Sequence, residues 1–243
     1  MIFKAKRGQT SYGEAIGILL LDTFTPFIQG DVGNATSYDY PVRFKRVDGL
    51  TVTKIFNHDP GFIESMVDCA KELEQEGVKA ITGDCGFMAI YQDSVKEKVN
   101  IPVFLTSLLQ IPFIRATIPS SSKIGVITAN SESLTEDVFN KIGITKNDSI
   151  VIGGLENSRY FREAAIEEKG SLDKDMMEKE VVSVVKNLIN ENPGIGSFLL
   201  ECSLLPAYSH AVQKITGLPV YDFLTMIDYV YSSLVKNKFQ DVM

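Results

Sequence analysis

Apolar and polar positions follow two patterns along the 243 residues. Short continuous apolar runs with glycine, proline or polar ends are typical of buried strands, and apolar residues three or four positions apart are typical of helices. The runs that predict strands are Ala15–Leu21, Lys79–Asp84, Pro102–Thr106, Lys123–Ala129, Ser149–Gly153, Ser197–Glu201 and Pro219–Tyr221. The segments that predict helices are Gly61–Glu76, Phe87–Val99, Ser131–Lys141, Asp173–Asn190, Leu204–Thr216 and Phe223–Lys236. Their alternation predicts an α/β fold with mainly parallel sheets.

The chain also contains an internal repeat. Shifted by 117 residues, Gly77–Cys85 aligns with Gly194–Cys202, and Pro102–Phe104 aligns with Pro219–Tyr221. Strand–helix units resemble one another in any α/β protein, so similarity alone would be weak support. Matched cysteines and prolines at equal separations favour a true duplication.

A second shift, of 108 residues, aligns Ile16–Ile18 with Ile124–Val126. The two halves therefore share the order of their elements and differ by an insertion. We predict two similar α/β domains related by a pseudo-twofold axis, with a cleft between them. The first domain is expected to contain residues 1–118 and 223–243, and the second residues 119–222.

Composition narrows the classes of function. The 24 Lys and Arg against 31 Asp and Glu give a net charge of −7, which argues against a nucleic-acid binder. The apolar run near the start is short, and Ile101–Pro119 is interrupted by proline, glutamine and arginine, so neither a signal peptide nor a membrane span is predicted. Three cysteines, Cys69, Cys85 and Cys202, suit the reduced thiols of a cytoplasmic protein.

No motif for a bound cofactor is found in the sequence. It has no phosphate-binding or dinucleotide-binding glycine pattern, and no cluster of Cys, His and acidic residues has the spacing of metal ligands. The histidines, His58 and His210, are far apart, so a cysteine–histidine nucleophile would have to form through space. We expect a protein that works without cofactor or metal.

The two repeated cysteines are the best candidates for chemistry. Cys85 and Cys202 each follow a predicted strand and open a predicted helix, at the edge where open α/β sheets bind ligands. The helix N-terminus there is expected to lower the pKa of a thiol toward neutrality, so that it can give and take protons. Two thiols on opposite sides of one cleft could invert the configuration of a carbon that bears an acidic hydrogen, because one removes a proton from one face and the other delivers a proton to the opposite face. Cys69 lies within a predicted helix and is interpreted as a small apolar residue.

Two other features near these cysteines have open interpretations. Asp84 and Glu201 directly precede the cysteines, and strand alternation should point their side chains away from the sulfurs. They could cap helices or touch a ligand, and close to the sulfurs their charge would raise the thiol pKa values. The Gly30–Asn34 loop either presents N–H groups or Asn34 to an anion, or forms a simple turn.

Four segments resemble the aspartate/glutamate racemase superfamily, which also contains hydantoin racemases, maleate isomerases and arylmalonate decarboxylases. They are Ile16–Thr23, Thr82–Met88, Ile124–Thr128 and Leu200–Pro206. The resemblance implies two α/β domains, a cofactor-free mechanism with Cys85 and Cys202 as the two acid/bases, and small substrates that carry a carboxylate. The residues that it implies at the substrate are Gly86, Phe87, Ser203 and Leu204. The other residues predicted to bind the substrate are Asp22, Thr23, Asn34, Thr128 and Asn130.

The segments after the cysteines depart from the racemase pattern. Amino-acid racemases of the superfamily usually carry Asn-Thr after the first cysteine and Thr with His or Glu after the second. This chain has Gly86-Phe87 and Ser203-Leu204, which replaces polar side chains by apolar ones. This departure weakens the case for aspartate or glutamate among the small amino acids and related compounds expected as substrates, and it leaves the expected proton chemistry unchanged.

The function predicted from the sequence is a cofactor-independent racemase or epimerase that acts on the carbon next to a carboxylate. One alternative is a decarboxylase or cis–trans isomerase on the same fold, for which a single thiol suffices. The other is a non-catalytic protein that binds a small molecule. The expected partner is a small substrate with a carboxylate, and neither nucleic acid nor membrane, with a homo-oligomer left open.

Overall fold

Two parallel sheets form the centre of the protein. The computed structural model describes residues 2–5, 7–9, 12–145 and 149–239. Within these ranges eight strands form two four-stranded sheets, ordered β2-β1-β3-β4 and β6-β5-β7-β8. The strands are β1 (Ile16–Leu20), β2 (Val42–Arg46), β3 (Ala80–Gly83), β4 (Val103–Phe104), β5 (Lys123–Thr128), β6 (Ile150–Gly154), β7 (Ile195–Leu200) and β8 (Val220–Tyr221). The protein is therefore an α/β protein built from two parallel sheets, as predicted.

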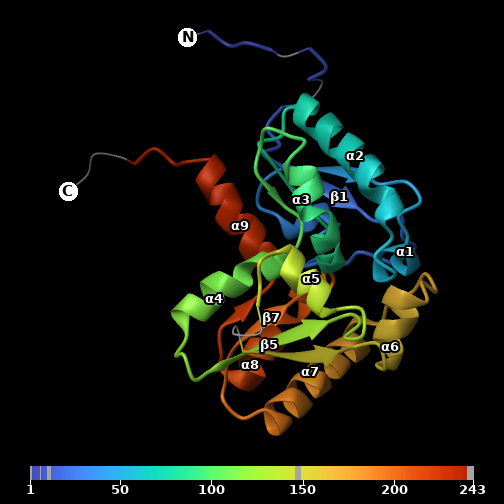
Figure 1. Ribbon diagram of the computed structural model, residues 1–243, viewed down its shortest axis with the longest axis vertical. Coiled ribbons are helices and arrows are strands. Elements are labelled where there is room, and N and C mark those ends of the chain that lie inside the picture. Colours follow the sequence, from blue (N-terminus) through green and yellow to red (C-terminus); the bar gives the residue numbers. More distant parts are fainter. Residues whose placement is uncertain (1, 6, 10–11, 146–148, 240–243) are drawn as a thin grey trace.

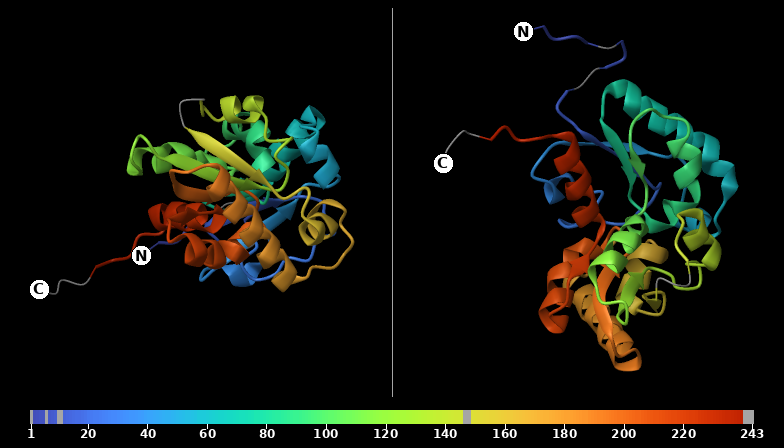
Figure 2. Two further views of the ribbon diagram at one scale, coloured as in Figure 1. Left: turned by 90° about the horizontal axis from the view of Figure 1, so that it is seen from below. Right: turned by 60° about the vertical axis from the view of Figure 1, so that its left-hand side comes forward.

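Helices flank each sheet (Figures 1 and 2). In the first half they are α1 (Val52–Phe56), α2 (Ile63–Glu76), α3 (Gln92–Lys96) and α4 (Ile111–Thr117). In the second half they are α5 (Glu136–Lys141), α6 (Arg159–Phe161), α7 (Lys174–Glu191), α8 (Ser209–Thr216) and α9 (Phe223–Leu234). Short 3₁₀ helices add η1 (Ala35–Ser37), η2 (Pro60–Phe62), η3 (Gly86–Tyr91), η4 (Ser107–Gln110) and η7 (Leu205–Tyr208), and η6 (Arg162–Ile166) is a π-helix. No helix in the described ranges is long and apolar enough to cross a membrane.

The internal repeat extends to the register of the strands. In the first sheet Ile16 pairs with Val42 and Ile81 with Val103. The equivalent pairs in the second sheet are Ile124 with Ile150 and Phe198 with Val220. The two residues of the first pair lie 108 positions before their equivalents in the second sheet, and the two residues of the second pair lie 117 positions before theirs. The insertion that separates the two shifts therefore lies between the second and third strands of the second half.

The last helix, α9, packs on the first sheet, although it follows the last strand of the second (Figures 1 and 2). Phe223, Met226 and Ile227 of α9 share an apolar core with Ile16 and Ile18 of β1. Asp222 caps the helix by accepting from the Thr225 N–H at 2.8 Å. This packing joins the C-terminal helix to the first half, while the predicted domain boundaries stay a prediction.

Several elements escaped the sequence pattern. β2 is an edge strand with the sequence Val-Arg-Phe-Lys-Arg, whose charged residues hide it from a search for apolar runs. The short helices α1, α4 and α6 were also missed, because three to seven residues are too few to establish a helical period. The predicted helices at Phe87 and Leu204 begin instead as the 3₁₀ turns η3 and η7.

Candidate active site

Both repeated cysteines lie at the carboxyl ends of the central strands. β3 ends at Gly83 and is followed by Asp84 and Cys85, and β7 ends at Leu200 and is followed by Glu201 and Cys202. The two sulfurs line one cavity of about 40 Å³. The rest of the lining is mainly apolar: Leu21, Thr23, Thr25, Phe27, Val52, Ile55, Phe56, Asp84, Ala129, Ala165, Ser203 and Leu204. The duplication thus brings two thiols from distant parts of the chain into one site.

The pKa of both thiols is raised well above its usual value, opposite to the sequence expectation. Burial is the largest cause for each, and the charge of Glu201 comes next. The N–H groups of Phe87 and Leu204 act on the respective sulfurs and oppose this shift. The expected lowering by a helix N-terminus was wrong, because the cysteines precede short 3₁₀ turns and lie among carboxyl groups. In the free protein both are therefore neutral thiols near neutral pH.

Asp84 is buried and lies at the cavity wall. Its two carboxyl oxygens accept from the Leu21 N–H at 3.0 and 3.2 Å, which connects the end of β3 to the end of β1. Burial raises its pKa to about 7, although these hydrogen bonds oppose the shift. The Leu21 N–H follows a strand, so this contact is not the helix cap that the sequence left open, and a contact of Asp84 with a ligand stays a prediction.

Glu201 lies between the two halves of the protein. It is fully buried, and its Oε2 accepts from Thr128 Oγ1 at 2.9 Å. Its Oε1 has no hydrogen-bond partner among the described residues. This oxygen fills the space beside Gly86, where an added Cβ would lie only 1.8 Å from it. Burial raises the pKa of Glu201 to about 7.

A third buried acid, Asp31, was not predicted. The Gly30–Asn34 loop is a turn in which Asp31 Oδ1 accepts from the Gly33 N–H at 2.6 Å and the Asp31 carbonyl accepts from the Asn34 N–H. Its Oδ2 has no partner among the described residues, and burial raises its pKa well above the usual range. The loop had drawn attention for its N–H groups, and the acid within it was overlooked because aspartate is common in turns.

The nine residues predicted to bind the substrate fall into three groups. Those that line the cavity are Thr23, Ser203 and Leu204. Those that lie behind it, around Glu201, are Gly86 and Thr128. Those outside the lining are Asp22, Asn34, Phe87 and Asn130.

The residues of the third group have other contacts. Asp22 accepts from the Gly49 N–H at 2.9 Å, Asn34 caps η1, and Asn130 accepts from the Glu132 N–H at 3.0 Å. Phe87 is buried with its ring edge-on to Phe56. The substrate-binding roles of all nine residues stay predictions.

The remaining cysteine and the histidines lie apart from this site. Cys69 is on α2, where its sulfur lies 3.8 Å from the Arg46 carbonyl. His58 lines a different cavity, and His210 is exposed on α8. Neither histidine is in the described lining of the cysteine cavity, so the geometry pairs neither with Cys85 or Cys202. In the described part of the chain no cluster of His, Cys, Asp and Glu could hold a metal ion.

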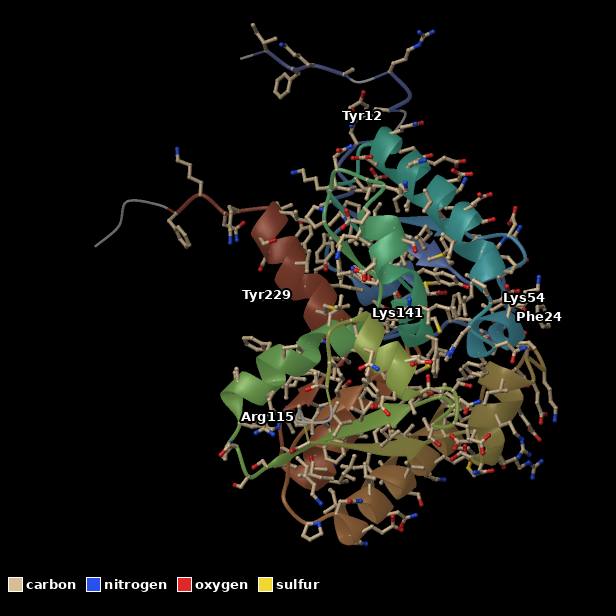
Figure 3. All side chains as sticks on the ribbon, viewed as in Figure 1. Tyr12, Phe24, Lys54, Arg115, Lys141 and Tyr229 are labelled. Carbon is tan, nitrogen blue, oxygen red and sulfur yellow. The ribbon has the colours of Figure 1, made fainter. Side chains whose placement is uncertain are left out.

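Hydrogen bonds beside the cavity lining join the second half of the protein to the first. Glu168 Oε1 accepts from Thr23 Oγ1 at 2.5 Å and from the Phe24 N–H at 2.7 Å, and Thr25 Oγ1 donates to the Ala164 carbonyl at 3.1 Å. Phe24 lies beside the α6 segment in Figure 3. Glu168 has a left-handed φ of 51°, which is costly for a residue other than glycine. No sequence signal pointed to Glu168.

Solved structures with a similar fold include proteins named as arylmalonate decarboxylase, glutamate racemase and an aspartate racemase homologue. A sulfate-associated variant of arylmalonate decarboxylase has a TM-score of 0.58 at 17% identity and covers 93% of this chain and 96% of its own. Glutamate racemase from Aquifex pyrophilus has a TM-score of 0.54 at 17% identity, and the match covers 91% of this chain and 84% of the racemase. An aspartate racemase homologue from Pyrococcus horikoshii has a TM-score of 0.54 at 18% identity, and the match covers 90% of this chain and 98% of the homologue. The fold is therefore that of the aspartate/glutamate racemase superfamily, as the sequence resemblance implied.

The curated relatives are more specific. Dimethylsulfoniopropionate lyase of Durusdinium sp. clade D is 32% identical over 230 residues, which cover 92% of this chain and 76% of the relative. Dimethylsulfoniopropionate lyase 3 of Emiliania huxleyi is 31% identical over 233 residues, which cover 92% of this chain and 60% of the relative. The chain belongs to the family of these dimethylsulfoniopropionate lyases. A scan against family models found no match.

These relatives correct the predicted function. They are named as enzymes, so the chain belongs to a family of enzymes. The relatives are named lyases, however, which overturns the racemase prediction together with its decarboxylase, isomerase and binding-protein alternatives. The sequence resemblance indicated the superfamily correctly, but a shared fold does not determine which reaction a site catalyses.

Proposed function

We propose that this protein is a carbon–sulfur lyase that acts on dimethylsulfoniopropionate. The observation that carries the proposal is that Cys85 and Cys202 line one largely apolar cavity in a chain whose relatives are named for this substrate. The substrate carries a dimethylsulfonium group on the carbon next to the one that bears its carboxylate. A site with thiol bases and apolar walls suits both the removal of a proton and the release of a neutral sulfide.

The reaction is a β-elimination. A thiolate takes a proton from the carbon next to the carboxylate, and the electrons of that C–H bond form a carbon–carbon double bond. The C–S bond breaks with its electron pair on sulfur, so the sulfonium leaves as neutral dimethyl sulfide and acrylate remains. The proton stays on the cysteine and must be lost to water before the next turnover. Unlike racemisation, elimination needs no second acid to deliver a proton to the opposite face.

The site supports this chemistry through the surroundings of the thiols. No lysine or arginine is in the described lining, whereas Asp84 lies in it and Glu201 behind it. Carboxyl groups without a neighbouring basic residue favour a cationic ligand. The apolar side chains Phe27 and Phe56 offer rings for the methyl groups and the charge of a sulfonium.

The test is to incubate the purified protein with dimethylsulfoniopropionate and measure dimethyl sulfide by gas chromatography and acrylate by nuclear magnetic resonance. We expect equal amounts of both products. Cys85→Ala and Cys202→Ala separate the roles of the thiols: loss of the base should lower kcat by about 10²–10⁴-fold. The proposal fails if the wild-type protein releases no sulfide, or if the variant that lacks both thiols is fully active.

A further inference from the structure

A second cavity lies between the two halves of the protein, apart from the cysteine cavity. Its volume is about 280 Å³, close to the lower end of the range for small-molecule sites. Its walls include apolar side chains of both halves, Pro60, Ile63 and Ile90 from the first and Val138 of α5 from the second. The described linings of the two cavities share no residue. The second cavity is therefore a separate place where a ligand could contact both halves.

His58 contributes an unsatisfied polar atom to this cavity. Its Nε2 is buried and has no hydrogen-bond partner among the described residues. The position of His58 is fixed, because its backbone N–H donates to the Ile55 carbonyl at 3.1 Å and its ring centroid lies 6.3 Å from that of Phe87. Its φ of 52° is in the left-handed region, which is uncommon for residues other than glycine. A buried nitrogen without a partner lowers stability, so a ligand that hydrogen-bonds to it gains affinity from this atom.

Helix α5 brings one charge of each sign to the same cavity (Figure 3). Asp137 in its first turn and Lys141 in its last are four positions apart, which places both side chains on one side of the helix. Both are exposed, and neither forms an ion pair with a described residue. Ser94 of α3 adds a hydroxyl group to the lining. The cavity thus offers separate partners for a negative and a positive group, with apolar walls beside them.

We propose that this cavity is a second ligand site and that it takes a small zwitterion. The Lys141 ammonium binds the anionic group of the ligand, the Asp137 carboxylate binds its cationic group, and His58 and Ser94 hydrogen-bond to its polar atoms. A ligand with a single charge would leave one of the two α5 groups facing a like charge, which opposes binding. A zwitterion satisfies both. The site does not depend on the proposed lyase reaction, because no lining residue is shared with the cysteine cavity.

A ligand in this position contacts η3 and α5 at once. η3 begins directly after Cys85 and ends at Tyr91, which lines the second cavity. The ring of Phe87 contacts both His58 and Phe56, and Phe56 lines the cysteine cavity. Binding therefore favours the arrangement of the two halves in which both walls of the site are present, and it should raise the temperature of thermal unfolding.

The proposal can be tested by nuclear magnetic resonance of the histidine rings. The chain has two histidines, His58 and His210, and His210 is exposed on α8 outside the described lining, so it is an internal control. A His210→Gln variant assigns the two signals. The probe is glycine betaine, a small unreactive zwitterion. We expect it to shift the His58 signal in a saturable way and to leave the His210 signal unchanged. Propionate and tetramethylammonium, which carry one charge each, should bind at least about tenfold more weakly.

Variants of the two α5 charges test the contacts directly. Asp137→Asn and Lys141→Met should each weaken the binding of glycine betaine by about tenfold, because each removes one charged partner. Both side chains are exposed, so neither substitution disturbs the core. Lys98→Met is the matched control, since Lys98 is an exposed lysine after α3 and outside the described lining. It should bind glycine betaine as the wild type does.

Three results would overturn the proposal. The first is the absence of a saturable His58 shift with glycine betaine. The second is equally tight binding of propionate or tetramethylammonium, which would exclude a site for zwitterions. The third is an unchanged His58 titration in both Asp137→Asn and Lys141→Met, which would mean that the ligand binds in the cysteine cavity and acts on His58 through Phe87. Release of dimethyl sulfide is measured separately, so a failure of the lyase assay leaves the second site standing.

Discussion

At the scale of single residues, Gly86 has a role that its neighbours explain. It follows Cys85 and lies against the Glu201 carboxyl, so the first residue of η3 must lack a side chain for that carboxyl to fit. Its backbone has no left-handed conformation, since it is not among the glycines with positive φ. Glycine is therefore required here for reasons of space. Its lack of a side chain lets Glu201 of the second half pack against the segment that follows Cys85 in the first half.

The expected consequence is that Gly86→Ala displaces the Glu201 carboxyl or separates the two halves. We expect a loss of kcat with dimethylsulfoniopropionate, together with destabilisation of about 1–3 kcal/mol, the usual cost of overpacking. Both are measured on one preparation, by steady-state kinetics and urea unfolding. Gly143→Ala is the control for adding a methyl group where there is room, because nothing lies within 4 Å of the added Cβ. The φ of 75° at Gly143 adds local strain to this control. A fully active and stable Gly86→Ala protein would show that the Glu201 carboxyl has room to move.

At the scale of elements, the segment from α6 through η6 to Gly170 contacts the residues after β1 and contributes Ala165 to the cavity lining. It contains a π-helix, which is rare and often found at functional positions, and the left-handed Glu168. Glu168 contacts Thr23 and Phe24, while Ala165 and Thr23 line the cavity. A volume of about 40 Å³ holds only a few water molecules, so binding of the proposed substrate, with its eight non-hydrogen atoms, requires the cavity to widen.

Removal of the Glu168 contact should therefore make the buried thiol more accessible. In Glu168→Ala we expect faster alkylation of Cys202 by iodoacetamide, measured by mass spectrometry, and a changed KM. Glu168→Gln should behave more like the wild type, because its amide oxygen can still accept from Thr23 and Phe24. The control is Glu167→Ala, since Glu167 is an exposed carboxylate whose partners are Arg162 and Lys169. Equal alkylation rates in the Glu168→Ala and Glu167→Ala proteins would contradict a role of Glu168 in closure.

At the scale of the whole molecule, the contact between the two halves contains buried acids without basic partners. The pKa values of Asp84 and Glu201 are raised to about 7 by burial, so their neutral forms are favoured in the folded state. In the unfolded chain both ionise near pH 4. The stability that comes from their neutral burial is complete below about pH 4 and is lost as the pH rises toward 7.

Unfolding should accordingly need less urea at about pH 8 than at about pH 5, as far as these two groups are concerned. Glu201→Gln cannot ionise, so its unfolding free energy should depend less on pH over this interval. The difference in pH dependence between the proteins should be about 1.4 kcal/mol for each unit by which folding raises the Glu201 pKa. Glu156→Gln serves as the control for the loss of one carboxylate elsewhere, since Glu156 accepts from the Ser131 N–H and is not in the described cavity lining. Parallel pH profiles for Glu201→Gln and the wild type would mean that Glu201 is ionised in the folded protein.

The local pattern of the sequence determined the elements with a strong period and the duplication. Apolar runs are long enough in the central strands to identify them, and the equal spacing from Cys85 to Pro102 and from Cys202 to Pro219 survives in the register of both sheets. The placement of the two cysteines in one cavity follows from this repeat, because equivalent strand ends of two similar sheets can face each other. The edge strand β2 and the short helices escaped because they carry little periodic signal.

Tertiary structure alone decided the electrostatics of the site and its closure. The pKa of a thiol depends on burial and on charges that approach from other elements, so the spacing around Cys85 and Cys202 could not show that it is raised. Glu201 faces Gly86 across the two halves, and Glu168 meets Thr23 from a point 145 residues away in the chain. Contacts of this kind leave no local pattern, because each partner is an ordinary residue in its own segment. Chain folding brings them together, and their position around the sulfurs determines what the two thiols can do.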